Sequence, residues 1–249
     1  MQITTLIIVY VLTALVQADR GGLQHRIVQG KMAEIGQFPY QASLRNSSLG
    51  HFCGGAIVKG YSVITTAKCV QGYSPESIFV VVGTNELAPS GRTVAVVAIL
   101  RHEAYDSGTL KNNIALLRTK EDVTQAYKAG KIDLNYGSPF AGQKCTLSGW
   151  GKESASALAY SNYLRYVELT LISVSECQTA WTGYDVDANN LCTKPEGKGG
   201  CHGDNGGPLV NNNNVLYGLL SWGYPCATNK PDVYVSIARY ANWINERAM

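Results

Sequence analysis

Short runs of β-branched and other apolar residues recur along most of the chain, separated by Gly, Pro, Asn and Ser. The clearest runs are Phe79–Gly83, Thr93–Leu100, Val167–Ile172 and Val215–Trp222. Strands of this length with turn residues between them are typical of an all-β barrel or sandwich. Four consecutive asparagines, Asn211–Asn214, precede the last run, and we expect them to form a hairpin tip because asparagine tolerates turn conformations.

Helical spacing is clear only near the end of the chain. Ile237, Tyr240, Ala241 and Ile244 fall at i, i+3, i+4 and i+7, which places them on one apolar face and predicts a terminal helix. A shorter helical turn is predicted from Ser175 to Trp181.

The first residues have the pattern of a signal peptide. An apolar run, Leu6–Val16, leads to Val16-Gln17-Ala18, with small residues at the positions that precede a cleavage site. The run is too short to span a bilayer as a helix. Residues 1–5 depart from the pattern because they carry no Lys or Arg, so a buried helix or a retained anchor is the alternative. We expect a secreted, extracellular protein that is not bound to a membrane.

Composition narrows the function classes further. The chain has 249 residues, of which 16% are charged, and a formal net charge of +3 without a basic run. This argues against nucleic-acid binding, which requires a concentrated positive surface. Seven cysteines in an exported chain predict disulfides with one thiol left over, and their spacing alone does not pair them.

Nine short segments, taken in order, resemble the chymotrypsin-like (trypsin) serine protease family, also called peptidase S1. The resemblance runs from Arg26 to the terminal helix. The segments are Arg26–Gly30, Phe38–Leu44, Cys53–Val58, Thr65–Cys69, Asn113–Leu117, Ser148–Gly151, Gly203–Pro208, Ser221–Gly223 and Pro231–Tyr234.

The resemblance implies two antiparallel β-barrels packed face to face, with the active site in the cleft between them and the terminal helix outside. We expect a signal peptide over residues 1–18, an activation peptide over 19–26 and a trypsin-like domain over 27–249. The barrels would lie near 27–135 and 136–235. Cleavage after Arg26 would free the amine of Ile27 to pair with Asp204; the alternative is a vestigial site that is never cut.

Family members carry a catalytic imidazole, carboxylate and hydroxyl in conserved contexts. At the matching positions this chain has Lys68, Asn113 and Asn205. We therefore expect a non-catalytic pseudoprotease, not an enzyme, that binds or regulates an extracellular protease, inhibitor or peptide. Two alternatives stand beside it: an active trypsin-like serine endopeptidase with an atypical mechanism, and a structural protein without a cleft ligand.

Other parts of the cleft match the family better. The backbone N–H groups of Gly203 and Asn205 match the oxyanion hole. The specificity pocket carries Gly199 where trypsin has an aspartate, with Gly223 and Asp232 also at pocket positions. Two interpretations of this pocket remain open: a basic or polar side chain enters it, or Asp232 half-fills it.

By resemblance, the disulfides are Cys53–Cys69, Cys177–Cys192 and Cys201–Cys226. Cys145 then remains as a buried free thiol, because its usual partner position holds Asn211. We expect a monomer without an intermolecular disulfide.

The remaining candidates are isolated. Asn46-Ser47-Ser48 is an acceptor sequence for N-glycosylation. The shortened loop 83–92 carries one Glu, so we expect no structural calcium, no other metal and no cofactor. We interpret the four histidines as structural residues rather than replacement bases; they are His25, His51, His102 and His202.

Overall fold

A computed structural model describes residues 30–48, 50–88, 90–224 and 226–249. The predicted signal peptide (1–18), the activation peptide (19–26) and the Arg26–Ile27 cleavage site lie outside the described residues. Among the helices within the described ranges, none is long and apolar enough to cross a membrane.

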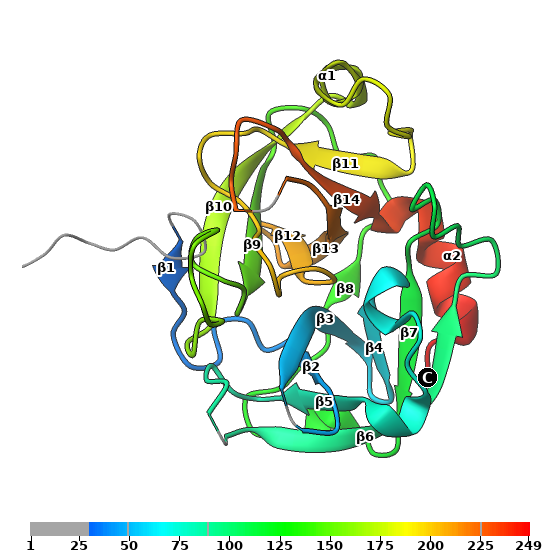
Figure 1. The fold of residues 1–249 in the computed structure, drawn as a ribbon. Helices are drawn as coiled ribbons and strands as arrows, with labels where there is room; N and C mark the ends of the chain where they lie inside the picture. The colour runs from blue at the N-terminus through cyan, green and yellow to red at the C-terminus, as the bar shows by residue number, and fades with distance from the viewer. Residues whose placement is uncertain (1–29, 49, 89, 225) are drawn as a thin grey trace, which may run out of the picture.

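Six antiparallel strands from the first half of the chain close into a barrel in the order β2-β3-β4-β7-β6-β5. Two of its strands correspond to the predicted apolar runs Phe79–Gly83 and Thr93–Leu100, and Figure 1 shows the barrel in blue to green. They are β2 (Gln41–Arg45), β3 (His51–Lys59), β4 (Ser62–Thr65), β5 (Phe79–Val82), β6 (Arg92–Arg101) and β7 (Ala115–Thr119).

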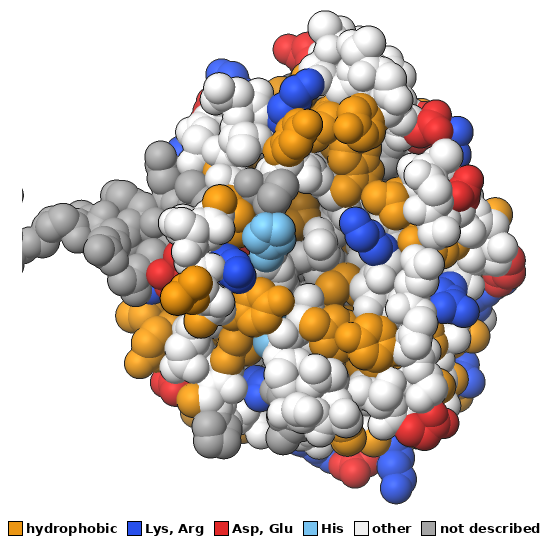
Figure 2. Space-filling view, in the orientation of Figure 1, with side chains coloured by type: hydrophobic (Ala, Val, Ile, Leu, Met, Phe, Trp, Pro, Cys, Tyr) orange, Lys and Arg blue, Asp and Glu red, His pale blue; other side chains and the backbone are white. Residues whose placement is uncertain are grey.

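A second ring of six antiparallel strands closes through the pairing of β10 with β9. Its members are β9 (Lys144–Gly149), β10 (Arg165–Ile172), β11 (Asn190–Thr193), β12 (Pro208–Asn211), β13 (Val215–Trp222) and β14 (Asp232–Ser236). The two barrels lie next to each other, with a hollow on the face shown (Figure 1 and Figure 2). The predicted all-β fold of two antiparallel barrels is confirmed.

Two short strands join the second barrel from outside the ring. β1 (Lys31–Met32) pairs with β10, although it precedes the first barrel in sequence. β8 (Asp133–Leu134), in the connection between the barrels, pairs in parallel with β13. Both ends of the first-barrel segment are therefore attached to the second sheet.

Both predicted helical segments are present. α1 (Val174–Ala180) begins with a capping box between Ser173 and Glu176. α2 (Ile237–Arg247) is the terminal helix. Its buried apolar residues share a core cluster with strands of both barrels, so the helix covers the junction between them. Three 3₁₀ turns complete the elements of the described ranges: η1 (Lys68–Val70), η2 (Pro75–Ser77) and η3 (Val123–Gln125).

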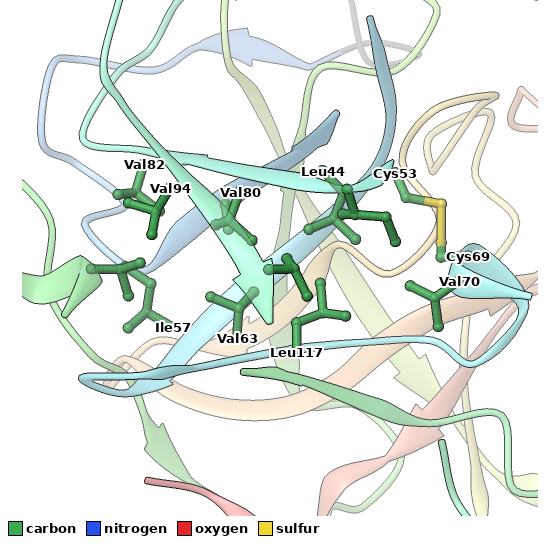
Figure 3. Close-up of a cluster of buried hydrophobic side chains, with 14 of the residues drawn as sticks. Leu44, Cys53, Ile57, Val63, Cys69, Val70, Val80, Val82, Val94 and Leu117 are labelled. Carbon is green, nitrogen blue, oxygen red and sulfur yellow. A yellow bond between two sulfur atoms is a disulfide. The ribbon is translucent and has the colours of Figure 1, made fainter. Parts of the chain in front are cut away.

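The core of the first barrel consists of alternate residues from its strands. Leu44, Val80, Val82 and Leu117 are fully or almost fully buried there, and the Cys53–Cys69 disulfide lies at the edge of the same cluster (Figure 3). Alternation places every second side chain of a strand on one face, which explains why short runs with this spacing form a barrel wall.

The run of asparagines forms the predicted hairpin tip between β12 and β13. The side-chain Oδ1 of Asn211 accepts hydrogen bonds from the backbone N–H groups of Asn213 (3.0 Å) and Val215 (2.9 Å). Asn214 has a φ of 58°, in the left-handed region that asparagine tolerates.

The three expected disulfides, Cys53–Cys69, Cys177–Cys192 and Cys201–Cys226, are present. Cys145 is free and fully buried, also as expected. It lies directly opposite Asn211 in the pairing of β9 with β12, and burial raises the pKa of its thiol to about 12. An inert thiol is the consequence, because the thiolate is the reactive form.

We expect Asn211→Cys to form a fourth disulfide with Cys145. Closing such a long loop is worth about 2–4 kcal/mol of unfolding free energy, less about 1 kcal/mol for the lost hairpin-tip hydrogen bonds. Thiol titration in denaturant should find one thiol in the wild-type chain and none in the variant. Urea unfolding should show net stabilisation relative to Asn211→Ser. Two free thiols in the folded variant would contradict the expected geometry.

Candidate functional site

The main candidate site is a pocket of about 160 Å³ between the barrels. A single water needs only about 10–15 Å³ of such space, so a side chain can enter. Figure 2 shows the hollow in the middle of the molecule's face, with a histidine and a basic side chain near its rim. The lining residues are Lys68, Gly200, Cys201, His202, Asn205, Leu220, Trp222, Gly223, Tyr224 and Asp232.

The first barrel contributes Lys68, which begins η1 immediately before the disulfide-bonded Cys69. The backbone N–H of Lys68 donates to Oδ1 of the buried Asn113 (2.8 Å), and Nδ2 of Asn113 donates to Oγ of Ser221 (2.9 Å). Asn113 therefore connects the two barrels behind the pocket. The structure brings the predicted positions Lys68 and Asn205 together at the pocket, with Asn113 behind Lys68.

The loop after β11 places Gly203 and Asn205 at the cleft. Gly203 has a φ of 97°, and a Cβ on it would lie 2.7 Å from the ring of Tyr160, so a side chain does not fit. The carbonyl of Asn205 accepts the N–H of Gly54 across the barrel junction (2.8 Å). Within the described part of the chain, the N–H groups of Gly203 and Asn205 have no hydrogen-bond acceptor.

Asp204 is fully buried behind this loop. Its two carboxylate oxygens accept from the backbone N–H groups of Gly151 (2.7 Å) and Cys201 (3.0 Å). Burial raises the pKa of Asp204 to about 7, although these two hydrogen bonds lower it. The predicted partner, the amine of Ile27, lies outside the described residues.

Asp232 lies at the closed end of the pocket, on β14. Its Oδ2 accepts the N–H of Gly200 (2.8 Å) and occupies the space next to Gly199, where a Cβ would contact it. Gly223 leaves room on the other side, since a Cβ there would lie 2.7 Å from Oδ1. Burial raises the pKa of Asp232 to about 7, with a smaller contribution from the charge of Asp204. The carboxylate therefore borders a pocket that remains open.

A serine–histidine pair lies behind the cleft. His51 contacts the carbonyl of Gly203 through Nε2 (3.0 Å), and since a carbonyl only accepts, Nε2 carries the proton. Nδ1 then accepts from the hydroxyl of Ser43 (2.9 Å). Both side chains are buried, and burial lowers the pKa of His51 to about 4. This imidazole is neutral at physiological pH and fixes the backbone next to Asp204.

Of the other predicted candidates, His25 lies outside the described residues. His202 lines the pocket. His102 contacts the rings of Tyr240 and Trp243 on the terminal helix. Asn46 lies in an exposed loop, where its Oδ1 accepts from the N–H of Ser48 (3.1 Å).

Two aromatic side chains at the site, Tyr160 and Tyr224, were not predicted from the sequence. Tyr160 packs on Gly203 and, at 5.3 Å between ring centroids, on His51. Tyr224 lines the pocket and stacks on Trp181 at 5.4 Å. Neither follows from a motif, because the contacts join loops that are distant in sequence. In the described ranges, no group of three His, Cys, Asp or Glu side chains is arranged to hold a metal ion.

Comparison with known proteins supports the trypsin resemblance across the chain. The family model described as Trypsin matches residues 27–244. Trypsin beta of Drosophila erecta is 36% identical over 229 residues, covering 91% of this chain and 90% of that protein. Trypsin alpha of Drosophila melanogaster and Trypsin alpha-4 of Lucilia cuprina are each 35% identical over 225 residues, covering 89% of this chain and 87% of theirs.

These comparisons contradict the prediction that the chain is not an enzyme. The relatives are named trypsins, which are serine endopeptidases, and they match both barrels at about 35% identity. The prediction is wrong because it rests on three side chains, whereas the similarity to trypsins covers the whole domain. The side chains at the three matching positions are Lys68, Asn113 and Asn205. Any peptidase chemistry at this cleft therefore proceeds without the usual imidazole, carboxylate and hydroxyl at these positions.

Asp232 should make stability depend on pH. Its folded pKa of about 7 exceeds the ordinary value of about 4, so its contribution is fully present below pH 4 and is lost as pH rises through 7. Asp232→Asn should therefore gain stability relative to wild type between pH 4.5 and pH 8. Urea unfolding across this range measures the difference, with the exposed Asp133→Asn as control. Parallel curves for wild type and Asp232→Asn would refute the assignment.

Proposed function

Because this chain belongs to the trypsin family, we propose that it binds a polypeptide in the cleft between its barrels, with a basic side chain in the pocket that ends at Asp232. The buried carboxylate at the end of an open pocket is the observation that carries this proposal. A Lys or Arg side chain entering there would pair with Asp232 in a site of low dielectric constant, where the attraction is strong.

The names of the relatives favour a second function at the same cleft, cleavage of the bound polypeptide. The pocket presents Lys68 and Asn205 where serine proteases have an imidazole and a hydroxyl, so cleavage would follow an atypical mechanism. The N–H groups of Gly203 and Asn205, which have no acceptor among the described residues, would stabilise an oxyanion in such a reaction.

We place this function outside the cell. The apolar run Leu6–Val16 has the features of a signal peptide, and the three disulfides suit an oxidising compartment. The basic side chain that enters the pocket would belong to an extracellular peptide, to a loop of a protease inhibitor, or to an exposed loop of a protease.

Peptide binding tests the proposal directly. Wild-type protein should bind a peptide with Arg at the pocket position at least tenfold more tightly than the same peptide with norleucine. Asp232→Asn should abolish this preference, and Asp133→Asn should retain it. Isothermal titration calorimetry gives both affinities. Equal binding of the two peptides by wild type would sink the proposal.

The pH dependence of binding has a defined sign. Below about pH 7 Asp232 takes up a proton in the free protein, so affinity for the Arg peptide should fall by up to tenfold per pH unit there and level off above pH 7. The norleucine peptide should show no such change. A flat profile for both peptides would contradict recognition by this carboxylate.

Cleavage is measured separately, by mass spectrometry of Arg and Lys peptides incubated with the full chain and with its Arg26-cleaved form. If the second function holds, the wild-type chain cuts after the basic residue. The triple variant Lys68→His, Asn113→Asp, Asn205→Ser should cut faster by orders of magnitude, because the triad is worth about 10⁶ in kcat in this class of protease. Intact peptides with wild-type protein would reject cleavage and leave the binding proposal standing.

A further inference from the structure

The two ends of the pocket carry side chains of opposite charge. Asp232 lies at the closed end, whereas Lys68 lines the opening. Lys68 is exposed and makes no ion pair or side-chain hydrogen bond with any residue that the structure describes. His202 also lines the pocket, and Asp232 is the one acidic residue among the described lining residues. A ligand that complements this arrangement carries a cation at one end and an anion near the opening.

Two backbone donors lie beside this opening. The N–H groups of Gly203 and Asn205 have no acceptor in the described ranges, and the conformation of their loop is fixed from several sides. His51 holds the carbonyl of Gly203, Tyr160 packs on its Cα, and the carbonyl of Asn205 is bonded to Gly54. Preorganised backbone donors of this kind bind an oxyanion without further rearrangement.

Nearby carboxylates do not compete for these donors. Asp204 is fully buried and its oxygens face the N–H groups of Gly151 and Cys201. Asp232 bonds to the N–H of Gly200 at the other end of the pocket. The ammonium of Lys68 and the two N–H groups are therefore left for an anion brought by the ligand.

We propose that the preferred ligand is a polypeptide that ends in this cleft, with a C-terminal Lys or Arg whose side chain pairs with Asp232 and whose terminal carboxylate is held by Lys68 and the N–H groups of Gly203 and Asn205. The proposal rests on the proposed function and specifies its ligand. An internal peptide segment carries no charge at that position and would leave Lys68 unpaired. Chain ends of this kind are produced by endoproteolysis after basic residues, so that class of reaction would supply the ligand.

Two peptides of one sequence ending in Arg test the inference, one with a free carboxylate and one with a terminal carboxamide. Calorimetry with the full chain should show the carboxylate form bound at least tenfold more tightly, as expected for charge-assisted hydrogen bonds. Lys68→Met should reduce that ratio to near one, while Lys68→Arg should retain most of it. Lys120→Met removes an exposed lysine outside the pocket and should leave the ratio unchanged.

The outcomes separate the two proposals. Equal affinities for the two peptides, or tighter binding of the carboxamide, would overturn the carboxylate inference and leave recognition of the basic side chain intact. Failure of the folded wild-type chain to bind either form would count against the proposed function itself. Thermal unfolding of each variant confirms folding, and mass spectrometry confirms that the peptides remain intact during the titration.

Discussion

The hydrogen bonds that join the two barrels determine the rest of the site. Gly54 donates to the carbonyl of Asn205, and Asn113 of the first barrel donates to Ser221 of the second. Each of these groups is buried or nearly so, and a buried polar group that loses its partner costs about 1–3 kcal/mol. The barrels therefore meet in one arrangement. The pocket, which is lined by Lys68 of the first barrel and by residues of the second, inherits its geometry from that contact.

Burial also explains why the second barrel contains two unusual carboxylates. Asp204 and Asp232 are both almost completely excluded from water, and each receives hydrogen bonds from backbone N–H groups rather than from a described cationic side chain. Desolvation outweighs these hydrogen bonds, so both groups ionise near neutral pH. The electrostatic character of the cleft can thus change within the physiological range.

Much of the fold could be predicted from the sequence, because alternation and turn residues act locally. The runs that became β5, β6, β10 and β13, the Asn211–Asn214 tip and both helices follow from such patterns. The disulfides required the family resemblance, since spacing alone does not pair cysteines. The pairing of β1 with the second barrel was not predicted, because two residues carry no periodic signal.

The site was predicted less completely. The resemblance located Lys68, Asn205 and Asp232, but the position of the Asp232 carboxylate between two glycines depends on packing across strands. The contact of Tyr160 with Gly203 joins two loops, and no sequence pattern in either loop predicts it. The prediction that failed, that the chain is not an enzyme, treated three positions in isolation, whereas the similarity to trypsins extends over both barrels.

The free thiol of Cys145 affects how the unfolded chain refolds. While the second barrel is intact, Cys145 is shielded by burial and cannot attack a disulfide. Once the chain unfolds, its thiol regains an ordinary pKa and can exchange with any of the three disulfides through a mixed-disulfide intermediate. Alkaline conditions would speed that exchange and yield scrambled isomers. Because unfolded chains with exchanged disulfides do not refold, the lifetime of the native protein is set by its unfolding rate rather than by its refolding rate.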